Sequence, residues 1–224
     1  MTRERRRDVG GDVRFHGRIA GFGAASGTRL VVGHWARSPF GAVTDVMVEN
    51  ADGHRMLFAP HPALADFVAQ TYRFDEVVVA PLDVDREGRT LALRSPRLEL
   101  SFAVGRRTPL GRLLRLVPRP LAVDPRWLAA IDPVARRLAP GSGTAGSAGG
   151  GAREFYGVTD AWRLDAAAAR LDGVGLGAMA PVDPPVGFGF ASPPRTPSMV
   201  AVVTTIRRAS SRARRPARSD RRAR

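Results

Sequence analysis

The order of the strand-like segments constrains the fold of this chain more than any other feature. About nine short segments have strand composition, and most of them lead into another strand rather than into a helix. Turns rich in glycine and proline separate them. A doubly wound parallel sheet needs a helix between successive strands. The sequence therefore predicts an α+β fold, mainly antiparallel β, built as a barrel or as two packed sheets with short covering helices.

The clearest local prediction is a hairpin followed by a helix. Residues 42–49 and 54–59 flank Asn50-Ala-Asp-Gly53, a turn sequence typical of tight hairpins. Residues 62–72 then carry apolar side chains at helical spacing, with a proline in the first turn. We expect two antiparallel strands and a helix over this region.

The pattern becomes helical after residue 108 and returns to strands after residue 153. Leu110, Leu113, Leu114 and Val117 repeat at helical spacing, and we expect them to face the core. Asp124 followed by Pro125 marks the start of another helix, which Pro133 should kink or split. The later segments are predicted as a strand at 154–164, a short helix or turn at 165–171, and strands at 186–190 and 199–206.

These patterns divide the chain into one folded domain with extensions. The predicted parts are a flexible N-terminus over 1–11, a single β-rich domain over 12–206 and a disordered arginine-rich tail over 207–224. The domain contains a helical insertion at 109–139 and a glycine-rich loop at 140–152. We expect a pocket between the sheet and the helical insertion.

Every basic residue is an arginine, because the 35 lysines and arginines of the composition include no lysine. This absence excludes Schiff-base chemistry and a phosphate-loop lysine. The chain also lacks cysteine, which excludes disulfides, thiolate nucleophiles and cysteine-ligated metals. No catalytic constellation or histidine metal motif is present, so the sequence predicts neither a cofactor nor a metal.

The net charge of +14 is concentrated at the C-terminus. The predicted tail would attract nucleic acid or an anionic membrane surface nonspecifically. Its nine arginines are Arg207, Arg208, Arg212, Arg214, Arg215, Arg218, Arg221, Arg222 and Arg224. No run of eighteen apolar residues predicts a membrane span, and no apolar segment follows the basic N-terminus as in a secretion signal. The expected compartment is the cytoplasm.

Two short segments combine aromatic, arginine and acid–base side chains, and they predict a ligand pocket. The candidate residues are His34, Trp35, Arg37, Arg153, Glu154 and Tyr156 of these segments, together with Trp127 of the helical insertion. The alternative is that these are rim aromatics and solvated charges. The sequence favours non-catalytic binding of a small, partly apolar or anionic molecule. A lysine-independent enzyme and nonspecific polyanion binding through the tail are the other two hypotheses.

Several motifs carry a family resemblance. Arg37-Ser-Pro-Phe-Gly41, Glu154-Phe-Tyr-Gly157 and the proline-rich segment 180–186 resemble an uncharacterised conserved family of high-GC actinobacteria over about 15–206. The strand-rich order and Pro-Phe-Gly41 also resemble the acetoacetate-decarboxylase-like β-barrels. Those decarboxylases depend on a catalytic lysine, so this second resemblance implies the barrel without that chemistry.

Overall fold

The computed structural model describes residues 12–138 and 142–208. Its strands are β1 (Val13–Ala24), β2 (Arg29–Arg37), β3 (Val43–Glu49), β4 (Arg55–Ala59), β5 (Glu76–Val79), β6 (Asp83–Glu87), β7 (Thr90–Arg94), β8 (Leu98–Arg107), β9 (Ala145–Ser147), β10 (Arg153–Leu171), β11 (Val174–Gly175), β12 (Met179–Ala180) and β13 (Ser198–Arg207). The helices are α1 (Pro62–Thr71), α2 (Pro109–Leu114), α3 (Arg119–Ala122), α4 (Pro125–Leu138) and the 3₁₀ turn η1 (Gly149–Gly151).

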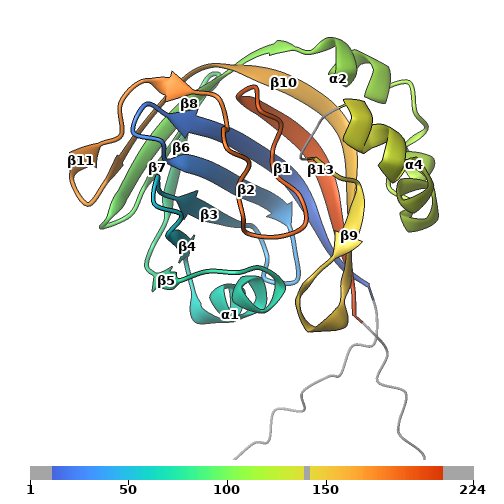
Figure 1. The fold of residues 1–224 in the computed structure, drawn as a ribbon, viewed down its shortest axis with the longest axis horizontal. Helices are drawn as coiled ribbons and strands as arrows, with labels where there is room; N and C mark the ends of the chain where they lie inside the picture. The colour runs from blue at the N-terminus through green and yellow to red at the C-terminus, as the bar shows by residue number, and fades with distance from the viewer. Residues whose placement is uncertain (1–11, 139–141, 209–224) are drawn as a thin grey trace, which may run out of the picture.

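The strands of the described residues form one curved sheet in the order β5-β4-β3-β2-β1-β13-β10-β8-β7-β6. All of these pairs are antiparallel except β4 with β5, which α1 joins by a crossover. The structure confirms the predicted fold class: a mainly antiparallel β fold with short covering helices (Figure 1).

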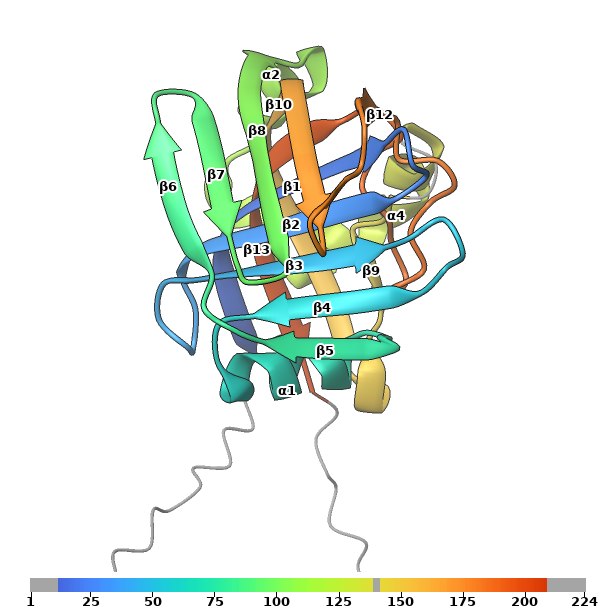
Figure 2. The same ribbon diagram turned by 90° about the vertical axis from the view of Figure 1, so that its left-hand side faces the viewer.

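Strand β10 turns the sheet back over itself. Its first part pairs with β13 and its second part with β8, and the register shifts at 158–160 and again between 162 and 166. Such bulges bend a strand and increase its twist. As a result β6, β7 and β8 cross over β1, β2 and β3 (Figure 2).

Each face of the β1–β4 region is covered by a different element. We call them the β8 face and the α1 face. On the β8 face, side chains such as Phe22 and Leu30 pack against Phe102 and Leu100 of β8. On the α1 face, side chains such as Leu57 pack against α1, and the loop 181–197 covers part of the sheet. Alternate residues of each strand point to opposite faces, so the register assigns every side chain to one of them.

The short helices begin where the sequence predicts a cap. Pro62 occupies the first turn of α1, and the side chain of His61 accepts a hydrogen bond from the amide of Leu64. Asp124 Oδ1 accepts hydrogen bonds from the amides of Arg126 and Trp127 at the start of α4. The predicted hairpin is also confirmed, with Gly53 at φ 84° in its turn.

Four local predictions are wrong. Residues 165–171 continue β10 instead of forming a helix or turn, and 186–190 contain no strand. Helix α4 is a single helix through Pro133, so the predicted split does not occur. Leu110 and Leu113 are 43% and 59% exposed, because α2 is too short to bury a full apolar face.

Arg207 corrects the boundary of the predicted tail. It is the last residue of β13, and its guanidinium nitrogens lie 2.8 Å from the two carboxylate oxygens of Asp12. Arg207 therefore belongs to the folded domain. The predictions for residues 1–11 and 209–224 fall outside the described residues. Within the described part of the chain, no helix has the length and apolarity needed to cross a membrane.

Candidate ligand-binding site

A buried carboxyl group lies beside two tyrosines on the α1 face. Glu154, near the start of β10, has no solvent exposure. Tyr72 Oη donates a hydrogen bond of 2.5 Å to Glu154 Oε1, and the Tyr72 and Tyr156 hydroxyl oxygens lie 2.9 Å apart. Glu154 Oε2 is buried without a hydrogen-bond partner among the described residues. A buried polar atom without a partner is uncommon in folded proteins and calls for an explanation.

Local backbone features bring the two tyrosines together. Helix α1 ends at Thr71, and Tyr72 adopts an extended conformation that releases it from the helix. The ring of Tyr156 stacks on that of Phe190, with centroids 5.4 Å apart and planes 22° apart. A Cβ at Gly189 would lie 2.8 Å from the Tyr72 ring. The glycine thus lets the loop 181–197 close over both tyrosines.

A second buried carboxyl group is held on the same face. Asp45 of β3 is buried, and its Oδ1 accepts a hydrogen bond of 2.8 Å from the indole nitrogen of Trp35. A Cβ at Gly33 would lie 2.7 Å from both of these atoms. Glycine at this position is what leaves room for the hydrogen bond.

Burial changes the protonation of both carboxyl groups. It raises the pKa of Glu154 to about 7, despite the opposing effect of the hydrogen bond from Tyr72. It likewise raises the pKa of Asp45 to about 7. Burial and the nearby carboxylate raise the pKa values of Tyr72 and Tyr156 well above the usual value. Near neutral pH the carboxyl groups of Glu154 and Asp45 are therefore partly protonated, while both tyrosines keep their hydroxyl protons.

A buried ion pair anchors the covering loop to the sheet. Arg29 Nη2 lies 2.7 Å from Glu49 Oε1, and both residues are buried. Glu49 Oε2 accepts a hydrogen bond of 2.6 Å from the backbone amide of Gly187. The carboxylate thus joins strand β2 to the loop that covers the α1 face.

The apolar side chains between these polar groups are only partly buried. Ile19 pairs with Val200, and Val31 pairs with Met47, on the same face of the sheet. These four side chains and Val158 all keep partial exposure. The α1 face is therefore not sealed completely by α1 and the loop. We call its buried acids, tyrosines and these apolar residues the α1-face site.

The structure brings three of the predicted site residues to this face. Trp35 and Tyr156 belong to its apolar cluster, and Glu154 is hydrogen-bonded to Tyr72 beside Tyr156. Their role in binding a ligand stays a prediction.

The other four predicted residues lie elsewhere. His34 points to the β8 face, where its Nδ1 lies 2.8 Å from Thr44 Oγ1. Arg37 is exposed at the end of β2. Trp127 is 37% exposed on α4, and the exposed Arg153 lies over the ring of Phe155. Single-residue alternation along the strands separates His34 from Trp35 and Arg153 from Glu154.

A separate open groove of about 510 Å³ lies on the β8 face. Residues 114–119 of the α2–α3 region form one wall, and Thr159, Asp160, Trp162 and Ala201 form the other. The sequence predicted a pocket between the sheet and these helices, but none of the seven predicted site residues lines this groove. Within the described residues, no group of three histidines or acids could hold a metal ion.

Comparisons with known proteins show little similarity. No protein-family model matches the chain, and no curated protein sequence matches it. Among solved structures, the chain is similar to the acetoacetate decarboxylase from Legionella pneumophila, with 11% sequence identity and a TM-score of 0.41. The similarity covers 88% of this chain and 85% of that one. The activity in that name is that of the Legionella protein. The actinobacterial family stays a prediction.

Proposed function

We propose that this protein binds a small, largely apolar molecule at the α1-face site, and that Glu154 and the two tyrosines contact its single polar group. The observation that carries the proposal is the unpartnered Oε2 of Glu154, buried beside two tyrosine hydroxyls. Ligand sites typically combine an apolar lining with a few polar groups that fix orientation. The partly exposed apolar side chains of this face supply such a lining.

The polar group of the ligand should be neutral. Among the described residues, Arg29 is the buried cation of this face, and it is already paired with Glu49. An anion beside Glu154 and Asp45 would be repelled once either acid ionised. A hydroxyl or carbonyl oxygen instead suits a carboxyl group that can donate or accept a hydrogen bond. A ligand hydrogen bond to Oε2 would also remove the cost of leaving that atom unpaired.

The test is an NMR titration of the full-length ¹⁵N-labelled protein with benzyl alcohol and acetophenone as neutral probes and benzoate as the anionic probe. The neutral probes should shift the Trp35 indole signal and the amide signals of 154–158 and 186–190 in a saturable way. Glu154→Gln should weaken this binding by about tenfold, as expected for one lost polar contact. Glu99→Gln, which changes an exposed glutamate on β8, is the matched control. Equal weakening by both variants, or shifts confined to other regions, would contradict the proposal.

A second candidate function is acid–base catalysis without lysine. The observation favouring it is that two carboxyl groups on one face have pKa values of about 7, where proton transfer in both directions is efficient. Turnover of a bound carbonyl probe, followed by ¹H NMR, should then depend on pH with a midpoint near 7. That dependence should disappear in Glu154→Gln. Binding without turnover would leave the first proposal as the function. Polyanion binding through residues 209–224 concerns residues outside the described structure.

A further inference from the structure

The groove on the β8 face is a second place where a ligand could bind, independent of the α1-face site. It lies between the α2–α3 segment and strands β10 and β13, on the opposite side of the sheet from Tyr156. Its volume of about 510 Å³ is within the usual range for small-molecule sites. Trp162 and the apolar side chains of Leu114, Leu116 and Val117 line it together with arginines. The groove therefore combines apolar surface with positive charge.

The positive charge of the groove exceeds its negative charge. Arg115 and Arg119 line it, and the guanidinium groups of Arg18 and Arg107 lie 5.8 Å and 5.6 Å from the ring centroid of Trp162. The single carboxylate of the lining, Asp160, already accepts from Arg107 Nε at 2.9 Å and 3.0 Å.

Three arginines around the groove remain without a carboxylate. Arg18, Arg115 and Arg119 form no ion pair with any other described residue. Arg115 and Arg119 line the same groove, so an anion bound there would offset the repulsion between their charges.

A histidine of β1, two residues from Arg18, is affected by the same positive charge. His16 pairs in register with Val203, and its Nδ1 is buried without a partner among the described residues. Burial and the nearby Arg37, Arg14 and Arg119 lower the pKa of His16. An anion in this region would offset the repulsion that keeps the imidazole neutral.

We propose that the groove binds a small phosphorylated molecule, with its phosphate between Arg115 and Arg119 and its apolar part against Trp162. Guanidinium groups match phosphate oxygens in geometry and can donate two parallel hydrogen bonds each. The groove is larger than a phosphate ion needs, and its apolar wall would otherwise face solvent: Leu116 is 78% exposed. Both features fit an organic phosphate better than a free inorganic ion.

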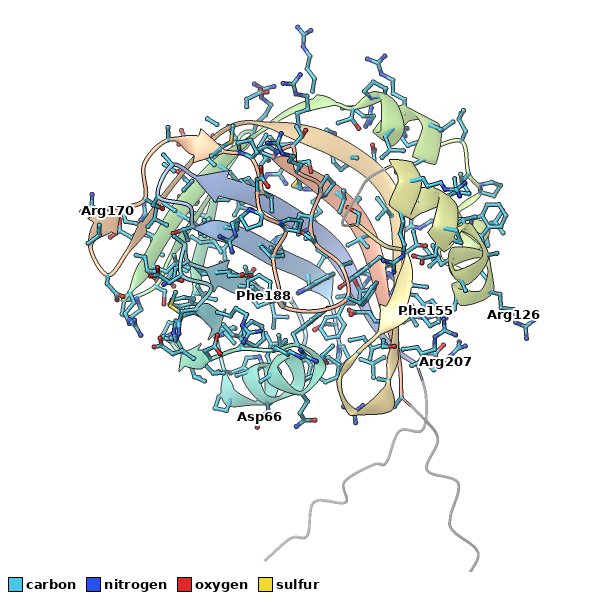
Figure 3. All side chains as sticks on the ribbon, in the orientation of Figure 1. Asp66, Arg126, Phe155, Arg170, Phe188 and Arg207 are labelled. Carbon is cyan, nitrogen blue, oxygen red and sulfur yellow. The ribbon has the colours of Figure 1, made fainter. Side chains whose placement is uncertain are left out.

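The test uses phenyl phosphate as the probe and the full-length ¹⁵N-labelled protein. Saturable shifts are expected for the amides of 114–119, for 159–162 and 201, and for the Trp162 indole. The double variant Arg115→Gln/Arg119→Gln should weaken binding by at least about tenfold. Arg126→Gln is the matched control, because Arg126 projects into solvent from α4, away from the body of the protein (Figure 3). The affinity of this variant for phenyl phosphate should stay within about twofold of the wild-type affinity.

Three results with the double glutamine variant and the probes would overturn the proposal. The first is equal weakening by the double variant and by Arg126→Gln. The second is a set of shifts confined to residues after Arg208. The third is groove shifts with a single-stranded oligonucleotide but none with phenyl phosphate, which would assign the groove to nucleic acid. If the double variant does not fold, Arg115→Lys/Arg119→Lys keeps the charge but removes the bidentate geometry, and it should still weaken binding severalfold. Unchanged affinity in that variant would also overturn the proposal.

Discussion

On the α1 face, the carboxyl groups of Asp45, Glu49 and Glu154 are buried under a helix and a loop, whereas on the β8 face Arg115 and Arg119 line a groove and remain exposed. Burial gives the first region unusual protonation and makes each of its polar contacts costly to lose. Exposure leaves the second region free to bind an anion without a large contribution to folding. The same sheet therefore separates a region where charge affects stability from a region where charge affects recognition.

Removing the buried cation should have the largest effect. Arg29→Met would leave Glu49 buried without its ion-pair partner and should lower the free energy of unfolding by about 3–5 kcal/mol. The measurement is urea unfolding at constant pH. Arg115→Met in the groove should change the free energy of unfolding by less than about 0.5 kcal/mol, because Arg115 is exposed and forms no ion pair within the described residues. Similar losses in the two variants would remove the contrast between the faces.

The pH dependence of stability should come from the α1 face. Because the pKa of Glu154 is raised to about 7, the folded protein binds more protons than the unfolded chain between about pH 4.5 and 7. Stability should therefore fall as pH rises through this window, by about 3 kcal/mol for Glu154 alone, and level off above it. Asp45 should add a loss of the same sign.

The substitution Glu154→Gln should remove the part of this pH dependence that Glu154 causes. The measurement is thermal unfolding from pH 4.5 to 8.5. The exposed Glu99→Gln variant should follow the wild-type curve. A wild-type protein that gains stability as pH rises from 5 to 7 would show that the buried acids ionise easily, and the account of this face would be wrong.

A glycine substitution tests the geometry around Asp45. Gly33→Ala would place a Cβ 2.7 Å from both Asp45 Oδ1 and the Trp35 indole nitrogen and so break their hydrogen bond. The buried carboxyl group would lose its partner, and we expect a destabilisation of about 2 kcal/mol. Gly175→Ala is the control, since a Cβ there meets nothing within 4 Å. Unfolding measurements that show no difference between the two would contradict the close approach.

The smallest expected effect is that of Tyr156→Phe. This change removes the hydroxyl that lies 2.9 Å from Tyr72 Oη but keeps an aromatic ring to stack on Phe190. Stability should fall by about 1 kcal/mol, the usual value for one hydrogen bond. The measurement is the Tm of each variant. A Tm decrease for Phe190→Leu as large as that for Tyr156→Phe would indicate that the stacking contributes as much to stability as the hydroxyl pair.

The sequence predicts the fold class and the 42–59 hairpin because local turn chemistry and strand order decide both. It misses the full length of β10, because pairing with β8 overrides the helical tendency of the alanine-rich residues 165–171. It also misses Asp45 and Glu49. These acids alternate with Val46 and Val48, a pattern typical of a strand with one solvated face. Here the loop 181–197 covers that second face.

The role of Tyr72 could not be found from local patterns at all. Its hydroxyl meets Glu154, which lies 82 positions further along the chain. Helical spacing predicts only that Tyr72 shares a face with Leu64 and Val68. The contact depends on where α1 stops and on how the sheet curves, and both are properties of the complete fold.

We propose that the two faces of the sheet carry separate sites, one for a neutral, largely apolar molecule and one for an organic phosphate. The most direct measurement is an NMR titration of one ¹⁵N-labelled sample of the full-length protein with benzyl alcohol, with phenyl phosphate, and with both together. We expect benzyl alcohol to shift Trp35 and residues 154–158, phenyl phosphate to shift Trp162 and residues 114–119, and the shifts to add when both are present. Competition between the two probes, or a common set of shifted residues, would contradict the account.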